Sequence, residues 1–173
     1  DIPSAKYQAV RNNNNPYEKI SFFFQNRAAF KMVELDHHFN LVPKNPSKVF
    51  IVADICSGPG GFSEYILTKL KWKAKVIGFT LRNEDDFRVD NFNVSSVPEA
   101  FHANYGVPEP DGGLGNGDIT SLANLKTLER FAGEKVDLVT ADGGFEISDF
   151  NNQEIFARKM LLGEFITSLM ILK

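Results

Sequence analysis

The sequence predicts an α/β fold in which a mostly parallel sheet is flanked by helices, and three observations lead to this fold class. An apolar, β-branched run over 49–52 is followed by Asp54, a glycine-rich turn at 58–61 and a helical pattern. A second apolar run, 74–80, follows that helix and completes the β-α-β order of a parallel strand pair. A third run, 135–141, again ends in an acid and glycines, at 142–144. Strands that alternate with helices in this way are typical of parallel sheets.

The glycine-rich turn Gly58-Pro59-Gly60-Gly61 is the feature around which the rest of the sheet is predicted to be arranged. Glycines leave backbone without Cβ atoms, so a ligand can approach it closely, and a strand–turn–helix corner is where open α/β sheets bind ligands. The spacing differs from the dinucleotide fingerprint G-x-G-x-x-G, and the lysine of a P-loop is missing. We therefore expect a nucleoside-like cofactor rather than a phosphate ligand. The alternative is a glycine-rich turn that binds nothing.

The composition suits one domain with a full core, since the chain has 173 residues, of which 43% are apolar and 24% charged. The net charge of −3 is unevenly spread, with +3 on residues 1–48 and −6 on residues 49–173, which permits an anionic substrate at one edge without requiring one. No apolar run is long enough for a membrane span, and no signal-peptide pattern is present. A single cysteine, Cys56, excludes an internal disulfide and suits a reducing compartment. The lack of a Cys/His cluster argues against a metal site.

Residues 17–39 show a helical pattern after an irregular start. The residues expected to form its core-facing stripe are Phe22, Phe23, Ala29, Phe30, Val33 and Phe39. Asn26 and Lys31 lie within it, and exposure on the surface is the ordinary role of such residues. The adjacent His37 and His38 do not point the same way, as metal ligands would.

The remaining elements follow in order along the chain. A helix is expected from Phe62 to about Trp72, a strand over 74–80, a polar surface segment over 82–97 and a short strand within 101–107. A loop rich in glycine and proline over 108–117 precedes a helix, a strand over 135–141 and a last helix from Gln153. The apolar residues expected to give that last helix an amphipathic to buried character are Ile155, Phe156, Met160, Leu161, Phe165, Ile166 and Leu169. The sequence stops at Lys173, where another strand is expected to begin.

Two corners of the predicted sheet carry the chemistry. Asp54, the glycine turn and Asp142 follow strand ends, so we expect them to converge at the same edge of the sheet. Cys56 lies in the turn without a nearby histidine and acid, which favours a small loop residue over a nucleophile. Asp118 precedes a helix and, taken alone, is typical of a turn or cap residue.

Four ordered motifs resemble one enzyme family. They are Asn26-Arg27-Ala28-Ala29-Phe30-Lys31, the stretch from Cys56 to Tyr65, Gly117-Asp118-Ile119-Thr120 and Ala141-Asp142-Gly143-Gly144-Phe145. Together they resemble the FtsJ-type ribose 2′-O-methyltransferases and, within these, the cap-specific mRNA (nucleoside-2′-O-)-methyltransferase 1 group. The resemblance covers the chain from about Arg11 onward.

The resemblance implies a Rossmann-like fold that binds S-adenosylmethionine and methylates the ribose 2′-hydroxyl of the first transcribed nucleotide of capped mRNA. The positions that match the family's cofactor-binding residues are Asn26, Cys56, Ser57, Gly58, Pro59, Gly60, Gly61, Phe62 and Asp118. Asp118 is expected at the adenosine end of the cofactor and the glycine loop at its amino-acid end. Lys31 and Asp142 match the first two members of the family's Lys-Asp-Lys-Glu tetrad, and Arg11, Asn151 and Gln153 match positions that contact capped RNA.

The resemblance also implies partners and a location: capped mRNA as substrate, the transcription or capping machinery as a possible associate, no membrane, and the nucleus. We expect a single truncated methyltransferase domain over 1–173, with a helical, substrate-side region over 1–48 and a Rossmann-like core over 49–173. The second lysine and the glutamate of the tetrad would follow Lys173, so we expect impaired cofactor binding and very weak catalysis from these residues alone. Two alternatives stay open: methylation of another RNA, such as rRNA or tRNA, and a catalytically inactive methyltransferase-like binding module.

Overall fold

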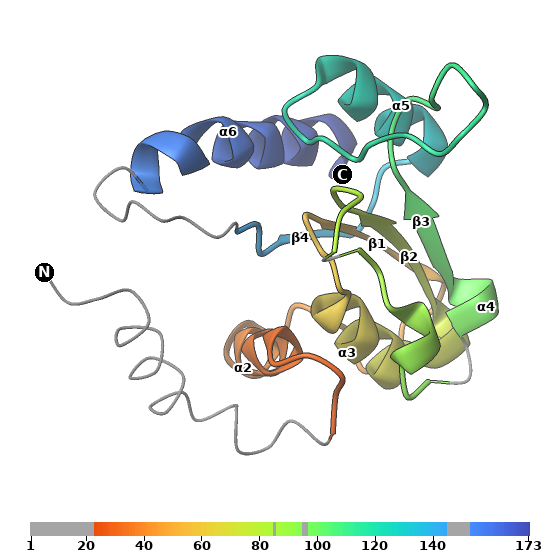
Figure 1. Cartoon of the computed structure of the whole chain (residues 1–173). Helices are drawn as coiled ribbons and strands as arrows, with labels where there is room; N and C mark the ends of the chain where they lie inside the picture. The colour runs from red at the N-terminus through yellow and green to blue at the C-terminus, as the bar shows by residue number, and fades with distance from the viewer. Residues whose placement is uncertain (1–22, 85, 95–96, 145–152) are drawn as a thin grey trace, which may run out of the picture.

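The structure is a computed structural model that describes residues 23–84, 86–94, 97–144 and 153–173. Its centre is a four-stranded parallel sheet in the order β3-β2-β1-β4 (Figure 1). The strands are β1 (Phe50–Ile55), β2 (Ala74–Phe79), β3 (Phe101–Asn104) and β4 (Leu138–Ala141). The helices are α2 (Ala28–Phe39), α3 (Gly61–Leu70), α4 (Val97–Ala100), α5 (Leu122–Ala132) and α6 (Gln153–Ile171), with short 3₁₀ helices η2 (Lys71–Lys73) and η3 (Val89–Asn91). The predicted α/β class with a parallel sheet is confirmed.

Helices cover both faces of the sheet, α2 and α3 on one side and α5 and α6 on the other (Figure 1). The alternation of side chains along β1 explains this arrangement. Val52 packs with the α2–α3 layer, whereas Ile51 and Ala53 pack with the α5–α6 layer. Because β1 lies between β2 and β4 and is covered on both faces, its continuous apolar run is the pattern expected of a central parallel strand.

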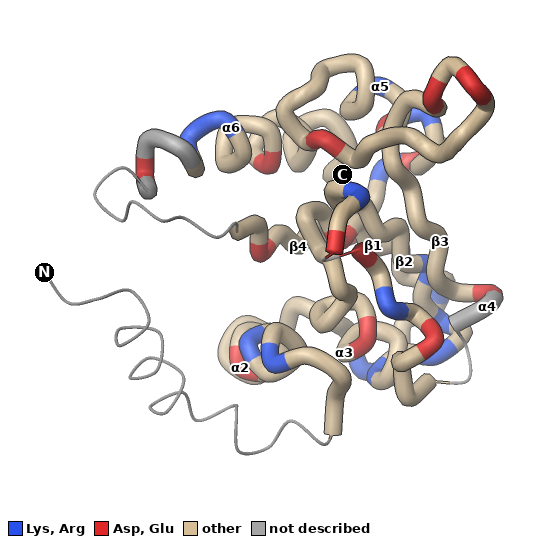
Figure 2. Tube along the Cα trace, in the orientation of Figure 1, with Lys and Arg blue, Asp and Glu red and all other residues tan. Residues whose placement is uncertain are grey.

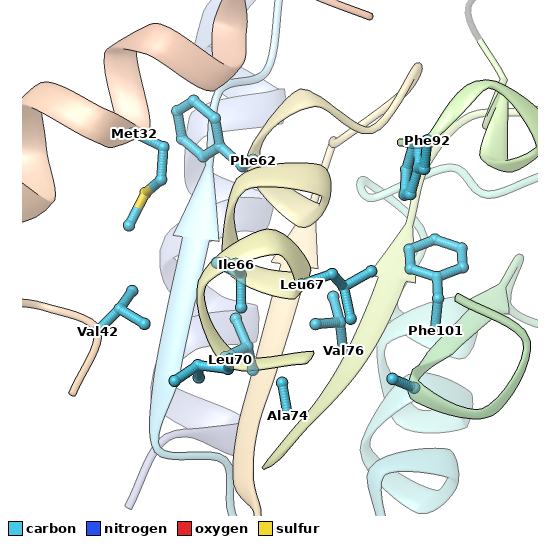
Figure 3. Packing of buried hydrophobic residues seen from close by; sticks show 12 residues of the cluster. Met32, Val42, Phe62, Ile66, Leu67, Leu70, Ala74, Val76, Phe92 and Phe101 are labelled. Carbon is cyan, nitrogen blue, oxygen red and sulfur yellow. The ribbon is translucent and has the colours of Figure 1, made fainter. Parts of the chain in front are cut away.

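Close packing of apolar side chains fixes α2 and α3 against the sheet. Figure 3 shows Ile66 and Leu67 of α3 beside Val76 of β2, and Met32 of α2 beside Phe62. All five side chains are buried. The position of α2, and therefore of Lys31 on its outer face, thus follows from the same core that holds the sheet.

A buried carboxylate on α2 also links α2 to α3 through hydrogen bonds. Asp36 accepts hydrogen bonds from the Val42 N–H (2.8 Å), the Tyr65 hydroxyl and the Lys69 ammonium. Burial alone would raise the pKa of Asp36, but its bonds to Lys69 and Tyr65 outweigh burial and hold that pKa below its ordinary value. The charged carboxylate is therefore matched by donors from α3 and from the chain that follows α2.

The predicted helix over 17–39 is wrong at its start within the described residues, because α2 begins at Ala28 and residues 23–27 form bends and a turn. The Asn26 side chain accepts a hydrogen bond from the Ala28 N–H (2.7 Å), a local bond that competes with helical pairing. The predicted stripe is wrong in part as well. Ala29 and Phe30 are buried, but Phe39 is 68% exposed and Phe23 is also exposed. Phe22 lies outside the described residues.

The last helix is confirmed as α6, but the burial expected of its apolar residues is wrong for four of them. Met160 packs partly buried against the core, and the side chains of Ile155 and Phe156 lie outside the description. Leu161, Phe165, Ile166 and Leu169 are exposed, Leu169 by 82%. The face of α6 that turns inward carries Glu164, Thr167 and Ile171 instead. The periodicity identifies a helix correctly, yet it does not specify which stripe meets the sheet.

The other predicted elements differ from the structure mainly at their ends. β3 is shorter than the segment 101–107, since the Gly106 N–H turns to the Asn104 side chain (3.0 Å). β4 is preceded by a parallel bridge between Val136 and Leu172, so the residues after α6 pair beside the sheet. Within the described residues, no helix is long and apolar enough to cross a membrane, and no group of His, Cys, Asp and Glu is arranged to hold a metal ion. The division of the chain at residue 48 stays a prediction.

Candidate active site

The turn after β1 is held against the end of β2. The Ser57 N–H donates to the Phe79 carbonyl (3.3 Å), and the Gly58 N–H donates to the Thr80 hydroxyl (3.1 Å). The Gly58–Pro59 peptide bond is cis, and Gly60 precedes the first residue of α3. These contacts place the predicted glycine turn beyond the carboxyl ends of two neighbouring parallel strands.

Two glycines are required here by close approach and backbone conformation. Gly60 has a φ of 110°, and a Cβ at this position would lie 2.4 Å from the Phe92 ring. Gly117 has a φ of 71°, and its Cβ would lie 1.6 Å from the Thr80 carbonyl oxygen. Both distances are far below contact, so a side chain at 60 would displace the Phe92 ring, and one at 117 would push away the backbone at Thr80.

Asp54 is a buried structural joint beneath the turn. Its carboxylate accepts hydrogen bonds from the Ser63 hydroxyl (2.6 Å) on α3 and the Thr140 hydroxyl (2.7 Å) on β4. Burial raises the pKa of Asp54 to about 7, and the two hydroxyls oppose that rise. Asp54 therefore ties β1, α3 and β4 together at the point where the turn begins.

Lys31 and Asp142 form an ion pair at the edge of this corner. The Lys31 Nζ lies 2.5 Å from the Asp142 Oδ2, although the two residues are 111 positions apart in the chain. Their side chains are 49% and 35% exposed, so both groups are open to a substrate from solvent. The pairing follows from the fold, because α2 packs on α3 while β4 pairs with β1.

A cleft of about 480 Å³ runs beside this pair. All four sequence motifs contribute to its lining, together with the segment after β2. The lining residues are Asn26, Arg27, Ala28, Lys31, Cys56, Gly58, Pro59, Thr80, Leu81, Asn83, Glu84, Gly117, Asp118, Ile119, Asp142 and Gly144. A small neighbouring pocket of about 30 Å³ reaches from the same turn toward Asp54 and Phe62. A volume of several hundred Å³ is the usual size of small-molecule sites.

The wall opposite the glycine turn is built by the loop before α5. The Asp118 Oδ1 accepts hydrogen bonds from the Thr120 N–H and the Thr120 hydroxyl, both at 2.8 Å. The Gly117 N–H donates to the Tyr105 carbonyl (2.8 Å), and the Asn116 carbonyl accepts from the Arg82 N–H (3.0 Å). These bonds fix Asp118 at the edge of the cleft.

A second buried carboxylate, Glu164 of α6, lies below the loop that contains Asp142. A Cβ on Gly143 would lie 2.2 Å from the Glu164 Oε1, and this oxygen has no hydrogen-bond partner among the described residues. Burial raises the pKa of Glu164, while the Cys56 thiol and the Gly143 N–H oppose that rise. Burial and the nearby Glu164 also raise the pKa of the Cys56 thiol, which argues against a reactive thiolate.

The structure brings together most, not all, of the residues predicted for the site. Those that line the main cleft are Asn26, Lys31, Cys56, Gly58, Pro59, Asp118 and Asp142. Ser57, Gly61 and Phe62 line the small pocket, and Gly60 lies against Phe92. Arg11 and Asn151 lie outside the described residues, and Gln153 begins α6 without a described side chain.

Sequence reasoning missed several lining residues, chiefly Thr80, Leu81, Asn83 and Glu84 after β2. One signal could have identified them. In a parallel sheet the residue after each strand faces the same edge, so Thr80 belongs beside the first glycine turn.

The FtsJ-like methyltransferase family matches residues 24–173, and this range is more than half of the chain. The chain belongs to the FtsJ-like methyltransferase family. Proteins named cap-specific mRNA (nucleoside-2′-O-)-methyltransferase 1 are similar to it: that of Danio rerio is 36% identical over 194 residues (100% of this chain, 23% of the relative), and that of Homo sapiens is 38% identical over 193 residues (99% and 22%).

Among solved structures, this FtsJ-like chain resembles a putative ribosomal RNA methyltransferase from Plasmodium falciparum, with a TM-score of 0.52 and 20% identity over 87% of this chain and 73% of that one. This likeness supports the fold. The chain spans 22–23% of the length of the two curated relatives named above.

Proposed function

We propose that this FtsJ-like domain transfers a methyl group from S-adenosylmethionine to the ribose 2′-hydroxyl of the first transcribed nucleotide of capped mRNA. The observation that carries the proposal is the Lys31–Asp142 pair, which stands half-exposed beside a cleft of the right size for a nucleoside cofactor. The cap-specific substrate is inferred from the names of the relatives. Action in the nucleus, beside the capping machinery, belongs to the same proposal.

The residues of the cleft fit S-adenosylmethionine. Gly58 lines the cleft and has no side chain of its own, and the Asp118, Glu84 and Asp142 carboxylates suit the hydroxyls and the positive charge of such a ligand. We assign Asp118 to the adenosine end and the turn from Cys56 to Phe62, with Asn26, to the amino-acid end. When bound, this group supplies a methyl carbon made electrophilic by its sulfonium.

Lys31 and Asp142 act on the ribose side of the reaction. A ribose hydroxyl is a weak nucleophile, so positioning it in line with the methyl group provides a large part of the rate. The Lys31 ammonium stabilises the negative charge that develops on the hydroxyl oxygen as the hydroxyl proton passes to water in the open cleft. The Asp142 carboxylate orients Lys31 and favours the positively charged methyl donor. Arg11, Asn151 and Gln153 are assigned to contacts with the capped RNA.

Replacement of either member of the pair tests this assignment. We expect Lys31→Ala and Asp142→Ala to lower methyl transfer by at least about 100-fold, because each removes one half of the oriented charge pair. The measurement is tritiated-methyl transfer to capped RNA by the full-length protein. Lys126→Ala and Glu129→Ala, which remove exposed charges from α5, serve as controls and should keep the rate. Near-normal rates in both pair variants would disprove the assigned roles.

The same assay tests the substrate. We expect labelling to depend on the 5′ cap, since the relatives are named as cap-specific enzymes. Equal labelling of capped and uncapped RNA would instead indicate methylation of another RNA.

A further inference from the structure

A cationic surface lies at the end of the sheet away from the cleft. We call it the lysine–tryptophan surface, and its residues are Lys44, Lys48, Lys71, Trp72 and Lys73. Lys44 and Lys48 belong to the loop before β1, and the other three form η2, directly before β2. The Lys73 Nζ lies 3.5 Å from the Asn45 side chain, which joins the two segments. Figure 2 shows Lys and Arg along the trace where α3 leads into β2, whereas the loop after β3 is acidic.

This surface is separated from the candidate active site by the length of a strand. It precedes β1 and β2, while the glycine turn and Thr80 follow them. β2 has six residues, which corresponds to about 20 Å from one end to the other. A ligand on the lysine–tryptophan surface is therefore not a ligand of the cleft.

The lysines of this surface are available to a ligand. All four are exposed, and none of them forms an ion pair with a described residue. Two nearby carboxylates already have partners, since Asp36 binds Lys69 and Asp137 binds both Lys173 and the Ile51 N–H. Lys48 also acts on Asp137 through its charge, without an ion pair, so Lys44, Lys71 and Lys73 are the lysines least engaged by carboxylates of the described residues. Glu99 on α4, which packs against η2, is an exposed carboxylate at the margin. Four positive charges thus gather on a chain whose net charge is −3.

Trp72 distinguishes this surface from an ordinary solvated group of lysines. It is the single tryptophan of the 173 residues, and it is 71% exposed. The Lys71 Nζ lies 6.0 Å from the centre of its ring, so a positive charge and a flat aromatic face stand together. An acidic protein segment would use the charges alone. A single-stranded polynucleotide uses both, because phosphates pair with lysines and bases stack on aromatic rings.

We propose that the lysine–tryptophan surface binds single-stranded RNA, with a base stacked on Trp72 and phosphates held by the lysines. The choice of RNA over DNA rests on the function proposed above: a capped transcript extends beyond its first nucleotide, and this surface binds its body. The binding itself does not depend on methyl transfer.

Direct binding is measured first. An uncapped oligouridylate is titrated into the full-length protein while tryptophan fluorescence is recorded. The same titration of the Trp72→Phe variant is subtracted, which leaves the signal of Trp72. We expect quenching with half-saturation below about 10⁻⁴ M, and Trp72→Ala should weaken binding of labelled RNA about 5- to 100-fold. Trp72 is exposed, so circular dichroism of this variant should be unchanged. The absence of quenching below about 10⁻⁴ M would overturn the proposal.

The lysines are tested through salt dependence. Removal of two phosphate contacts in Lys71→Ala/Lys73→Ala should make the slope of log K against log salt shallower by about 1.4. The matched variant Lys126→Ala/Arg130→Ala removes two exposed charges from α5 and should keep the slope. Polyglutamate is then tested as a competitor of RNA binding. If it competes fully and Trp72→Ala binds RNA as the wild type does, the partner is an acidic protein and the proposal of RNA binding is overturned.

Methylation kinetics test whether the RNA that this surface binds is the body of the transcript that is methylated. Trp72→Ala should raise KM for a capped RNA of about 30 nucleotides, which reaches the surface, and leave KM for a capped trinucleotide and both kcat values unchanged. An equal effect on both substrates, or none on either, would overturn the assignment to the transcript body. If capped RNA is not methylated at all, the proposed function fails, while the fluorescence titration still decides whether the surface binds RNA.

Discussion

Asp54 shows, at the scale of one residue, that the position that closes a strand can be structural rather than catalytic. Its carboxylate is buried and joins Ser63 to Thr140, and burial raises its pKa to about 7. The ordinary value is 3.8, so protonation is favoured in the folded state. A raised folded-state pKa contributes stability that is fully present below pH 3.8 and is lost as the pH rises through about 7.

We therefore expect Asp54→Asn to flatten part of the pH dependence of stability. As the pH rises from 4 to 8, the free energy of unfolding of the variant should increase relative to that of the wild type by on the order of 4 kcal/mol, because the variant has no buried carboxyl group to ionise. Urea unfolding followed by circular dichroism at several pH values measures this difference.

Asp137→Asn is the matched control, with the opposite sign. Burial alone would raise the pKa of Asp137, but the Ile51 N–H and Lys173 outweigh it and lower that pKa. The wild-type side chain thus stabilises the fold above its unfolded-state pKa and loses that contribution as the pH falls. Parallel pH profiles for the wild type and Asp54→Asn would contradict the assignment of Asp54 as a buried carboxyl with a raised pKa.

At the scale of an element, the loop before α5 forms one wall of the cleft only because glycine stands at 117. A Cβ there would collide with the Thr80 carbonyl, so Gly117→Ala must move the loop and Asp118 with it. We expect cofactor affinity to fall by at least about tenfold, or about 1.4 kcal/mol. Isothermal titration with S-adenosylmethionine measures this loss.

Gly112→Ala in the same region provides the control. Gly112 also has a positive φ, of 85°, but its Cβ would meet nothing within 4 Å. Its cost is therefore the strain of the left-handed conformation, roughly 1–2 kcal/mol of stability, without a change in affinity. Similar loss of affinity in both variants would show that strain, not the position of the loop, is responsible.

The elements also show what the sequence could and could not predict. β1 and its turn were predicted because a short β-branched run followed by glycines fits few other structures. The start of α2 was missed because the Asn26 side chain competes for the Ala28 N–H. The exposure of Leu169 was missed because periodicity identifies a stripe but not the surface that covers it. Thr80 directly follows a predicted strand and could have been placed at this edge, whereas Asn83, further along the loop, enters the cleft through the path of that loop in the assembled structure.

At the scale of the whole molecule, strand order predicts where the structure is most resistant to opening. β1 pairs with strands on both sides and is covered by helices on both faces, whereas β3 stands at one edge of the described sheet. We expect the amides of Val52 and Ala53 to exchange with solvent only on global unfolding, and those of His102 and Ala103 to exchange faster. Native-state hydrogen exchange measures both, and equal protection of β1 and β3 would contradict this order.

The distance in sequence between Lys31 and Asp142 has a consequence for the making of the protein. The two residues are 111 positions apart, so their ion pair exists only after α2, β1 and β4 have come together. A chain that is still being synthesised presents Lys31 long before Asp142 leaves the ribosome. Contacts of such long range form late and slowly in folding. The ion pair therefore forms only after the strands of the sheet have paired, and a partly synthesised chain lacks it.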